Sequence, residues 1–481
     1  SCRSAPDEDQ IQRNRELVGS WTQIMEEGSG PRATTIRHFF LDPDGFLKVG
    51  SAELGPRSRV ALVPDDVEYD GTNIRWKEGG SSFLGAVAAS KDTISLQYGS
   101  GDPPTAYSFV RYPEGDALWR DLMAAVDAEL DYVVPEATDD GWACAGLDSV
   151  RIDRKPLLAL VRRIVEGKYD DLHGMLLVKD DALVLEEYFA ARGRMHGPVL
   201  RRVFRDKLHH LGSTTKSVTS LLIGIAIDKG MIESVDVPIF DFFPEYEQLR
   251  TTENDRILLR HLLTMTAGLE WEQFRYDWSD PRNDAAQMWR VDDVLEYTLS
   301  KPVVAAPGEE FEYSNGVSTL LGGVLRNATG MEADAFAEEN VFRPLGINDY
   351  EWTRYPDGSI ETDGGLALRL RDLAKIGRLF LDGGEWEGDR IVSREWVEES
   401  TRTQIKLRGP GAGYGYKWQQ MSLESDDGTV HYYFMPGYGG NILAVFPTLD
   451  MVVALTGANY DWNVRSVYRE MLQDRLISAL R

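Results

Sequence analysis

The sequence predicts an α+β domain preceded by a small all-β domain. Residues 15–112 consist of short β-type runs separated by turn residues, a pattern typical of a small barrel or sandwich. Residues 145–481 begin and end with β-type runs around a long helical middle, which indicates one antiparallel sheet built from both ends of the domain. A chain of 481 residues is long enough for two domains with separate cores.

The composition argues against several classes of partner. Lys and Arg number 52 against 78 Asp and Glu, which gives a formal net charge of −26. Such an acidic surface repels nucleic acid and anionic membranes, and no apolar run reaches transmembrane length. The two cysteines, Cys2 and Cys144, form no Cys-x-x-Cys pair, and no spaced cluster of His and Asp suggests a metal. We therefore expect no metal, no cofactor and no nucleic-acid partner.

The first residues resemble the start of a bacterial lipoprotein. Cys2 follows a small residue and precedes a polar stretch, as in a lipoprotein cut just before its lipidated cysteine. On this interpretation residues 1–14 are a flexible tether, and a lipid on Cys2 attaches the protein to the bacterial cell envelope, in the periplasm or at the surface. A chance cysteine in a cytoplasmic protein is the alternative.

Turn signals divide residues 15–112 into strands. Asp42-Pro43-Asp44-Gly45 and Asp70-Gly71 each lie between two β-rich runs and predict hairpins. The stretch LVGSWT, residues 17–22, resembles the glycine–tryptophan opening of lipocalin-like domains, so we expect a packing or binding module here. Residues 113–144 are interpreted as a helix followed by a linker.

The second domain, residues 145–481, starts with a predicted hairpin that turns at Asp180-Asp181. Helical stretches and loops follow, and strands return after residue 393. An amphipathic helix over residues 463–481 is expected to end the chain.

The stretch LGSTTKSVTSLLIGIAIDKG, residues 211–230, predicts a buried helix with a nucleophile at its start. Its apolar residues cover nearly the whole circumference, so the helix is expected to lie in the core. Ser213 and Lys216 then share one face of the first turn. A lysine at the mouth of a buried helix is partly desolvated, which favours a neutral amine that can accept a proton. The alternative is an ordinary serine N-cap.

Two further motifs supply partners for Ser213. The tripeptide Tyr313-Ser314-Asn315 is the only Tyr-x-Asn in the sequence. The stretch FMPGYGGN, residues 434–441, is glycine-rich and falls on a predicted strand. A serine, a lysine, a tyrosine and the backbone of such a strand are the parts needed for acyl transfer without a histidine.

The order of these motifs resembles the β-lactamase-like serine hydrolases, specifically the class C branch. That branch contains class C β-lactamases, DD-peptidases, family VIII carboxylesterases and 6-aminohexanoate-dimer hydrolases. The segments that frame the motifs are similar too, over residues 256–271, 307–315 and 364–384. The resemblance covers about residues 145–481 and leaves the amino-terminal domain outside.

The resemblance implies a role for each motif residue. Ser213 would be the acylated nucleophile, Lys216 its proton acceptor and Tyr313 the proton shuttle to the leaving group. Asn315 would hold the lysine and contact substrate. The backbone N–H groups of Ser213 and Tyr438 would form the oxyanion hole.

The third motif departs from the pattern of the family. Members that recognise β-lactams carry Lys or His, then Thr or Ser, then Gly, whereas this chain has Met435-Pro436-Gly437. Gly437 is expected to support the site together with Tyr438, but the cation and the hydroxyl that grip a carboxylate are absent. Arg275 or Arg408 could replace the cation.

Other candidate residues have two interpretations each. Tyr276 and Trp278, in a loop over residues 274–289, could line an acyl pocket or pack as surface aromatics. His209-His210 precedes Ser213, but no Gly-x-Ser-x-Gly elbow is present, so a structural role is favoured over that of a triad base.

The sequence therefore predicts a serine hydrolase that forms an acyl-enzyme on Ser213 and acts on an ester or a small linear amide. A DD-peptidase or β-lactamase acting on D-alanyl peptides or β-lactams is the alternative. A non-catalytic binding protein of the same fold is disfavoured, because the Ser, Lys, Tyr and Asn of the motifs are all present.

Overall fold

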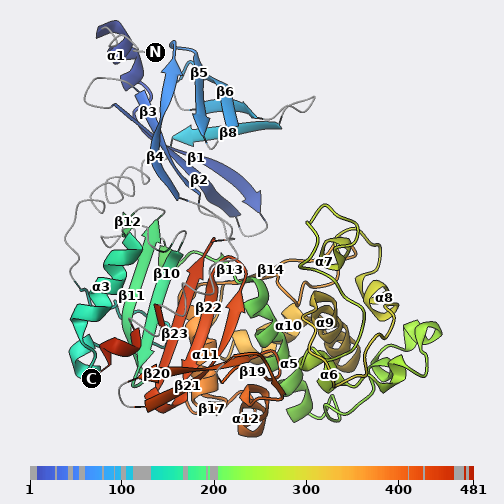
Figure 1. Ribbon diagram of the computed structural model, residues 1–481. Coiled ribbons are helices and arrows are strands. Elements are labelled where there is room, and N and C mark those ends of the chain that lie inside the picture. The colour runs from blue at the N-terminus through green and yellow to red at the C-terminus, as the bar shows by residue number, and fades with distance from the viewer. Residues whose placement is uncertain are drawn as a thin grey trace. The chain divides into compact units, whose positions relative to one another are not determined.

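The computed structural model (Figure 1) divides the chain into two compact units. The first unit contains residues 1–131, 161–173 and 187–207, and the second contains residues 132–160, 174–186 and 208–481. The structure describes residues 8–27, 30–41, 47–53, 60–78, 81–90, 93–98, 105–111, 132–165, 169, 172–190, 193–194, 204–409, 411–425, 428–459, 471–472 and 476–480. None of the helices in these ranges has the length and apolar character of a membrane-spanning segment.

The first unit contains a closed barrel of eight strands. Each strand pairs with its neighbours in the sequence, and β8 pairs back to β1 in antiparallel register. The strands are β1 (Gly19–Glu27), β2 (Gly30–Leu41), β3 (Leu47–Glu53), β4 (Val60–Tyr69), β5 (Asn73–Glu78), β6 (Ser81–Val87), β7 (Thr93–Tyr98) and β8 (Thr105–Arg111). Alternate residues such as Val67 and Tyr69 point into a core that also holds Phe39 and Phe109. The strands that the turn signals predicted over residues 15–112 are thus present in this barrel.

The predicted hairpin at Asp70-Gly71 is confirmed. The Asp70 carboxylate accepts hydrogen bonds from the N–H groups of Thr72 and Asn73, and Gly71 has a φ of 102°, which favours glycine. The turn predicted at residues 42–45 lies outside the described residues, although the strands on either side of it pair with each other.

Residues 1–14 were predicted to be a flexible tether, but residues 8–14 are helical in the structure. Helix α1 (Glu8–Arg15) forms there, because its side chains find partners on the barrel. Gln10 donates to the carbonyl of Tyr69 at 2.8 Å, and the Tyr69 hydroxyl donates to Glu16 at 3.2 Å. Cys2 and the helix predicted after residue 113 lie outside the described residues, so lipidation and a place in the cell envelope stay predictions.

The larger sheet has the strand order β12-β11-β10-β23-β22-β21-β20-β19-β18, and β9 pairs in parallel with β11. The strands are β9 (Ala143–Cys144), β10 (Leu172–Lys179), β11 (Ala182–Ala190), β12 (Gly193–Arg194), β18 (Ile405–Lys406), β19 (Gly413–Tyr414), β20 (Gln419–Ser425), β21 (Gly428–Gly437), β22 (Asn441–Phe446) and β23 (Met451–Gly457). Strands from both ends of the predicted domain meet where β10 lies beside β23, as the sequence predicted. Asp180 and Asp181 turn the β10–β11 hairpin with positive φ angles of 49° and 65°.

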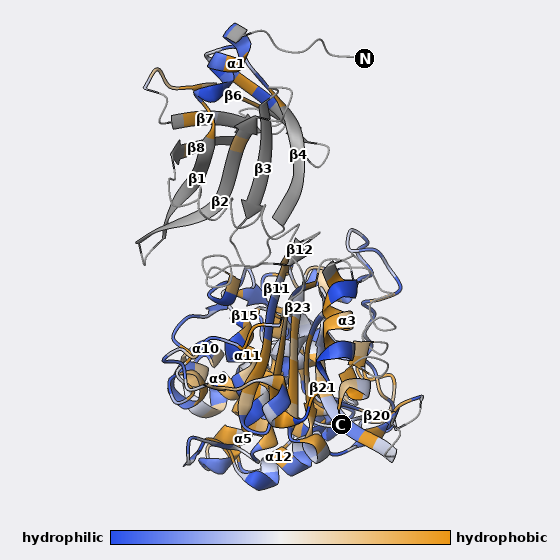
Figure 2. Cartoon of the chain, turned by 90° about the vertical axis from the view of Figure 1, so that its left-hand side faces the viewer, coloured by the Kyte–Doolittle hydropathy of each residue, from blue (hydrophilic) through white to orange (hydrophobic). Residues whose placement is uncertain are grey.

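Helices lie beside the larger sheet, with α6 to α9 on one side of it and α3 at the opposite edge (Figure 1). Helix α11 packs on β22 and β23, and α5 packs on α9. Figure 2 shows apolar residues concentrated on the sheet and on the inner faces of these helices. The named helices are α3 (Arg154–Val165), α5 (Thr215–Asp228), α6 (Leu259–Leu263), α7 (Asp284–Gln287), α8 (Val294–Leu299), α9 (Asn315–Thr329), α10 (Ala333–Ala337), α11 (Leu370–Leu381) and α12 (Arg394–Thr401).

Two small sheets complete the second unit. One consists of β13 (His209–His210), β15 (Leu366–Leu368) and β14 (Glu351–Trp352), and the other of β16 (Glu385–Trp386) and β17 (Asp389–Arg390). Strand β13 leads directly into the segment that carries Ser213. Most of the helix predicted over residues 463–481 lies outside the described residues.

Candidate active site

Ser213 lies in a 3₁₀ turn, η2 (Gly212–Thr214), directly before helix α5. Neither η2 nor α5 begins with a side-chain cap, so the interpretation of Ser213 as an ordinary N-cap is wrong. The Ser213 hydroxyl instead accepts a hydrogen bond from Lys216 Nζ at 3.0 Å. The prediction that both residues share one face of the first turn is confirmed.

Lys216 lies in the interior at the start of a helix that is buried on almost every side. Residues 215–226 of α5 are all buried, and Lys216 itself is 2% exposed. Its Nζ also donates to the carbonyl oxygen of Asp363 at 2.6 Å. The same atom lies 5.1 Å from the centre of the Tyr313 ring, so the structure brings Ser213, Lys216 and Tyr313 together.

Tyr313 and Asn315 flank the start of α9. Ser314, between them, caps this helix by accepting the N–H of Val317 at 3.2 Å, which explains why a polar tripeptide precedes an apolar helix. The Asn315 backbone N–H donates to Gln273 Oε1 at 2.9 Å, and Gln273 Nε2 donates to the Asn315 side chain at 3.4 Å. The structure thus pairs Asn315 with Gln273 and gives Lys216 the Asp363 carbonyl, which differs from the predicted Asn315–Lys216 contact.

The end of β21 packs against the turn that holds Ser213. The Thr214 hydroxyl donates to the carbonyl of Met435 at 3.2 Å. A Cβ on Gly212 would lie 2.8 Å from the backbone nitrogen of Tyr438, and one on Gly437 would overlap the carbonyl of Leu211. Glycine is needed at both positions, and their close contact brings the backbone of Tyr438 beside that of Ser213.

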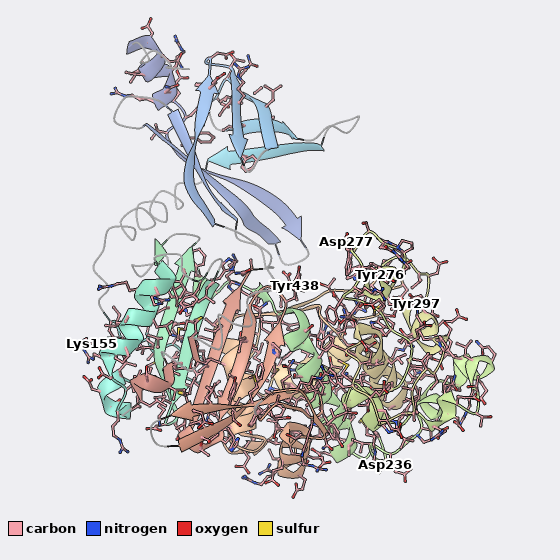
Figure 3. The ribbon with its side chains drawn as sticks, in the orientation of Figure 1. Lys155, Asp236, Tyr276, Asp277, Tyr297 and Tyr438 are labelled. Atoms are coloured by element: carbon pink, nitrogen blue, oxygen red, sulfur yellow. The ribbon has the colours of Figure 1, made fainter. Side chains whose placement is uncertain are left out.

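The third motif, residues 435–437 at the end of β21, brings no charged side chain to the site. Met435 is 1% exposed, and Pro436 has no backbone N–H. Strand β20 pairs with β21 only as far as Phe434, so residues 435–437 pair with β22 alone. The Tyr438 side chain, labelled in Figure 3, is exposed.

Tyr276, one of the two residues predicted to line an acyl pocket, contacts other residues of its own loop. The Tyr276 ring has Arg282 3.9 Å from its centre and Arg275 5.5 Å away, and Trp278 is exposed. Figure 3 shows Tyr276 on this loop. The contact from the loop to the site comes instead from Phe274, whose ring centre lies 5.7 Å from that of Tyr313. Of the aromatic residues in this loop, Phe274 is thus one that contacts Tyr313, whereas Tyr276 packs against two arginines of its own loop.

Both predicted cation replacements, Arg275 and Arg408, are exposed. Arg275 contacts Tyr276. A second lysine near Lys216 is Lys417, which is 3% exposed. Burial, together with the nearby charge of Lys216, holds the pKa of the Lys417 amine well below its usual range, while Asp363 opposes that shift.

His209 and His210 form β13 and pair with Leu368 and Ala367. The carbonyl of His210 accepts the side-chain N–H of Asn441 at 3.0 Å, which ties this strand to the start of β22. These contacts are structural, in keeping with the favoured interpretation of the two histidines.

Sequence reasoning missed Gln273, Phe274, Asp363 and Lys417. Asp363 directly precedes Gly364-Gly365, which begin one of the framing segments, so its position could have indicated a role. Lys417 stands in the stretch GYGYKW, residues 413–418, where no motif marks it. The combined group can move protons among a hydroxyl, an amine and a phenol beside two backbone N–H groups, as acyl transfer requires.

Comparison with known proteins identifies similar sequences and folds. The family model described as Beta-lactamase matches residues 161–474. The 6-aminohexanoate-dimer hydrolase of Paenarthrobacter ureafaciens is 27% identical over 215 residues, which cover 40% of this chain and 50% of that protein. Esterase EstB of Burkholderia gladioli is 28% identical over 34% of this chain and 43% of its own length. The D-alanyl-D-alanine-carboxypeptidase/endopeptidase AmpH of Escherichia coli is 31% identical over 32% of this chain and 38% of its own length.

The chain thus spans half or less of the length of these relatives. The crystal structure of a family VIII carboxylesterase has the same fold, with a TM-score of 0.51 and 19% identity over 68% of this chain and 95% of that one. Because the family model covers more than half of the 481 residues, the chain belongs to the beta-lactamase family.

Proposed function

We propose that the chain is a serine hydrolase that cleaves an ester or a small linear amide through an acyl-enzyme on Ser213. The observation that carries the proposal is the 3.0 Å hydrogen bond between Lys216 Nζ and Ser213 Oγ, made in the interior of the second unit. A buried amine at this distance is a suitable base for the serine hydroxyl.

In the proposed reaction, Ser213 Oγ attacks the carbonyl carbon and its proton passes to Lys216. The negative charge on the former carbonyl oxygen is stabilised by the N–H groups of Ser213 and Tyr438. Tyr313 gives its proton to the leaving group and regains one from Lys216. A water molecule then attacks the carbonyl carbon of the acyl-enzyme, the bond from that carbon to Ser213 Oγ breaks, and the water proton passes through the same groups to Ser213 Oγ as the free acid leaves.

The absence of charge on residues 435–437 supports an uncharged substrate. A penicillin or a D-alanyl peptide brings a carboxylate, whose burial costs several kcal/mol unless a cation or hydrogen-bond donors meet it. An ester needs only the nucleophile, the oxyanion donors and an apolar wall. Action on D-alanyl peptides stays the second candidate, since one relative is named a D-alanyl-D-alanine-carboxypeptidase.

Labelling with a fluorophosphonate and with a fluorescent penicillin, side by side, tests the proposal. We expect strong labelling by the phosphonate and weak labelling by the penicillin, together with hydrolysis of p-nitrophenyl butyrate. A protein that reacts with neither probe and cleaves no ester or amide would be a binding protein of the same fold.

For the amino-terminal unit we propose a lipocalin-like role as a packing or binding module. Support comes from the closed barrel of eight strands in sequence order and from its apolar core.

A further inference from the structure

Phe274 is an exposed apolar side chain that lies against a residue of the proposed reaction. Its ring centre is 5.7 Å from that of Tyr313, and the two ring planes are tilted by 40°. The Phe274 residue is 51% exposed, whereas Tyr313 is half-buried and has the Lys216 amine 5.1 Å from its ring centre. Single exposed apolar side chains are common on proteins, so the informative observation is the place of this one, beside the phenol that donates the proton.

Hydrogen bonds fix the backbone on both sides of Phe274. Its own N–H donates to Glu272 Oε1 at 3.1 Å. The side-chain amide of Asn283, which is 3% exposed, donates to the carbonyl of Gln273 at 3.3 Å and to that of Tyr276 at 2.8 Å. A buried side chain thus fixes the residue before Phe274 and the residue two positions after it.

A second set of contacts ties this segment to helices α7 and α8. The N–H of Glu272 donates to Asp284 Oδ2 at 2.6 Å, and the N–H of Asp284 donates back to the carbonyl of Glu272 at 2.7 Å. Asp284 is 8% exposed, and its Oδ1 accepts the hydroxyl of Tyr297 on α8 at 2.5 Å. The Lys301 amine pairs with the same oxygen, so the charge of this buried carboxylate is compensated. The segment before Phe274 therefore has a fixed place on the helical part of the second unit.

Gln273 links the segment to the start of α9. Its Oε1 accepts the backbone N–H of Asn315 at 2.9 Å and the indole N–H of Trp271 at 2.7 Å. Because both donors meet the oxygen, the amide nitrogen faces the Asn315 side chain, to which it donates at 3.4 Å. Tyr313 lies two residues before Asn315, so the same contacts set the spacing between Tyr313 and Phe274. The aromatic pair is thus preorganised rather than left to chance contact.

We propose that Phe274 contacts the leaving group of the substrate and makes the site selective for esters or amides whose alcohol or amine part has an apolar body, such as a phenyl ring. This inference rests on the proposed function and deepens it. In that reaction Tyr313 gives its proton to the leaving oxygen or nitrogen, which must come within about 3 Å of the phenol oxygen. An apolar group attached to that atom is then within reach of the Phe274 ring. Contact between the two removes apolar surface of both from water.

The test compares esters that share an acyl group and differ in the leaving group. In Phe274→Ala, kcat/KM for phenyl butyrate should fall about tenfold, the size of one lost aromatic contact, whereas kcat/KM for methyl butyrate should stay within about twofold. This ratio reports the reaction up to acylation, in which the leaving group is still present. Phe274→Leu keeps an apolar side chain and should lose no more than about threefold on phenyl butyrate. Because Phe274 is exposed, both variants should keep the wild-type Tm.

The matched control is Met231→Ala, which removes an apolar side chain of similar exposure, 45%, just after the end of α5 that is remote from Ser213. It should leave both esters unchanged.

Three outcomes in an active wild type overturn the inference but not the proposed function. The first is no loss on either ester in Phe274→Ala. The second is a loss on methyl butyrate as large as that on phenyl butyrate, which would assign Phe274 a structural role beside Tyr313. The third is a loss that grows with acyl length across phenyl acetate, butyrate and hexanoate, which would place Phe274 on the acyl side. A wild type that cleaves no ester and forms no Ser213 adduct overturns the proposed function itself.

Discussion

Two groups of residues lie near the turn that holds Ser213, and they are built from different kinds of side chain. The first, called here the ionisable wall, contains Lys216, Tyr313, Asp363 and Lys417, all of them ionisable and most of them buried. The second, called here the strand wall, is formed by residues 434–437 of β21, which have no charged side chain and contact the serine turn through their backbone. The first wall is equipped for proton transfer, whereas the second offers hydrogen bonds and shape but no grip on a charged substrate.

This difference indicates that the reaction rate depends on the ionisable wall and the choice of substrate on the strand wall. Changes in the ionisable wall should reduce the rate for every substrate, because each substrate needs the same proton transfers. Changes in the strand wall should alter which substrates react and how well the oxyanion is held. The predictions below test this division.

The largest effect is expected from the nucleophile. Ser213→Ala should lower kcat/KM for p-nitrophenyl butyrate by about ten-thousandfold or more, since no covalent intermediate can form. Intact-mass analysis after treatment with a serine-directed phosphonate should show one adduct on the wild type, mapping to the Ser213 peptide. An adduct that persists in Ser213→Ala would place the nucleophile elsewhere.

The next effect concerns the strand wall and the choice of substrate. Turnover of nitrocefin should be lower than that of p-nitrophenyl butyrate by about a thousandfold in kcat/KM, which corresponds to roughly 4 kcal/mol of transition-state binding. The physical reason is that Met435 and Pro436 provide neither a cation nor a hydrogen-bond donor for the carboxylate of the β-lactam. Nitrocefin rates equal to or above those of the ester would contradict this interpretation of the third motif.

Loss of a proton carrier should have a smaller effect than loss of the nucleophile. Lys216→Ala and Tyr313→Phe should each lower kcat by on the order of a hundredfold, and the double variant by little more than the worse single one, because both serve one transfer. Steady-state kinetics on all four proteins give the comparison. Fully additive losses would show that the two residues do not share a task.

The smallest effect is expected where the strand wall meets the serine turn. Gly437→Ala should lower kcat about tenfold with little change in KM, because the new Cβ pushes the end of β21 away from Leu211 and widens the oxyanion site. Gly146→Ala is the matched control, since its Cβ would meet only Val134 at an ordinary 3.8 Å. Equal kinetics in the two variants would show that the end of β21 does not contribute to catalysis.

Features set by local sequence were predictable. The hairpin at Asp180-Asp181 follows from turn chemistry, and the burial of α5 follows from apolar residues on all of its faces. The juxtaposition of Ser213 with Lys216 follows from helical spacing alone. In each case the residues that decide the structure lie within one turn or one element.

Features set by tertiary contacts were not predictable. The partner of Lys216 is a carbonyl 147 residues away, and Asn315 takes its partner from a glutamine 42 residues earlier. No periodicity relates such positions. The helix at residues 8–15 was likewise missed, because contacts with the barrel stabilise it and its own sequence looks like a polar tail.

The side chain of Asn441 joins three segments that are remote in sequence. It donates to the carbonyls of His210, 231 residues away, and of Tyr438, and it accepts the N–H of Gly457. Contacts between residues so far apart form late in folding, because the chain must first give up the entropy of a long loop. Helix α5 can therefore form while the two backbone N–H groups proposed to bind the oxyanion, those of Ser213 and Tyr438, are still apart. A newly synthesised chain would gain its secondary structure first and its ability to stabilise an oxyanion only when the strands on both sides of this asparagine have met.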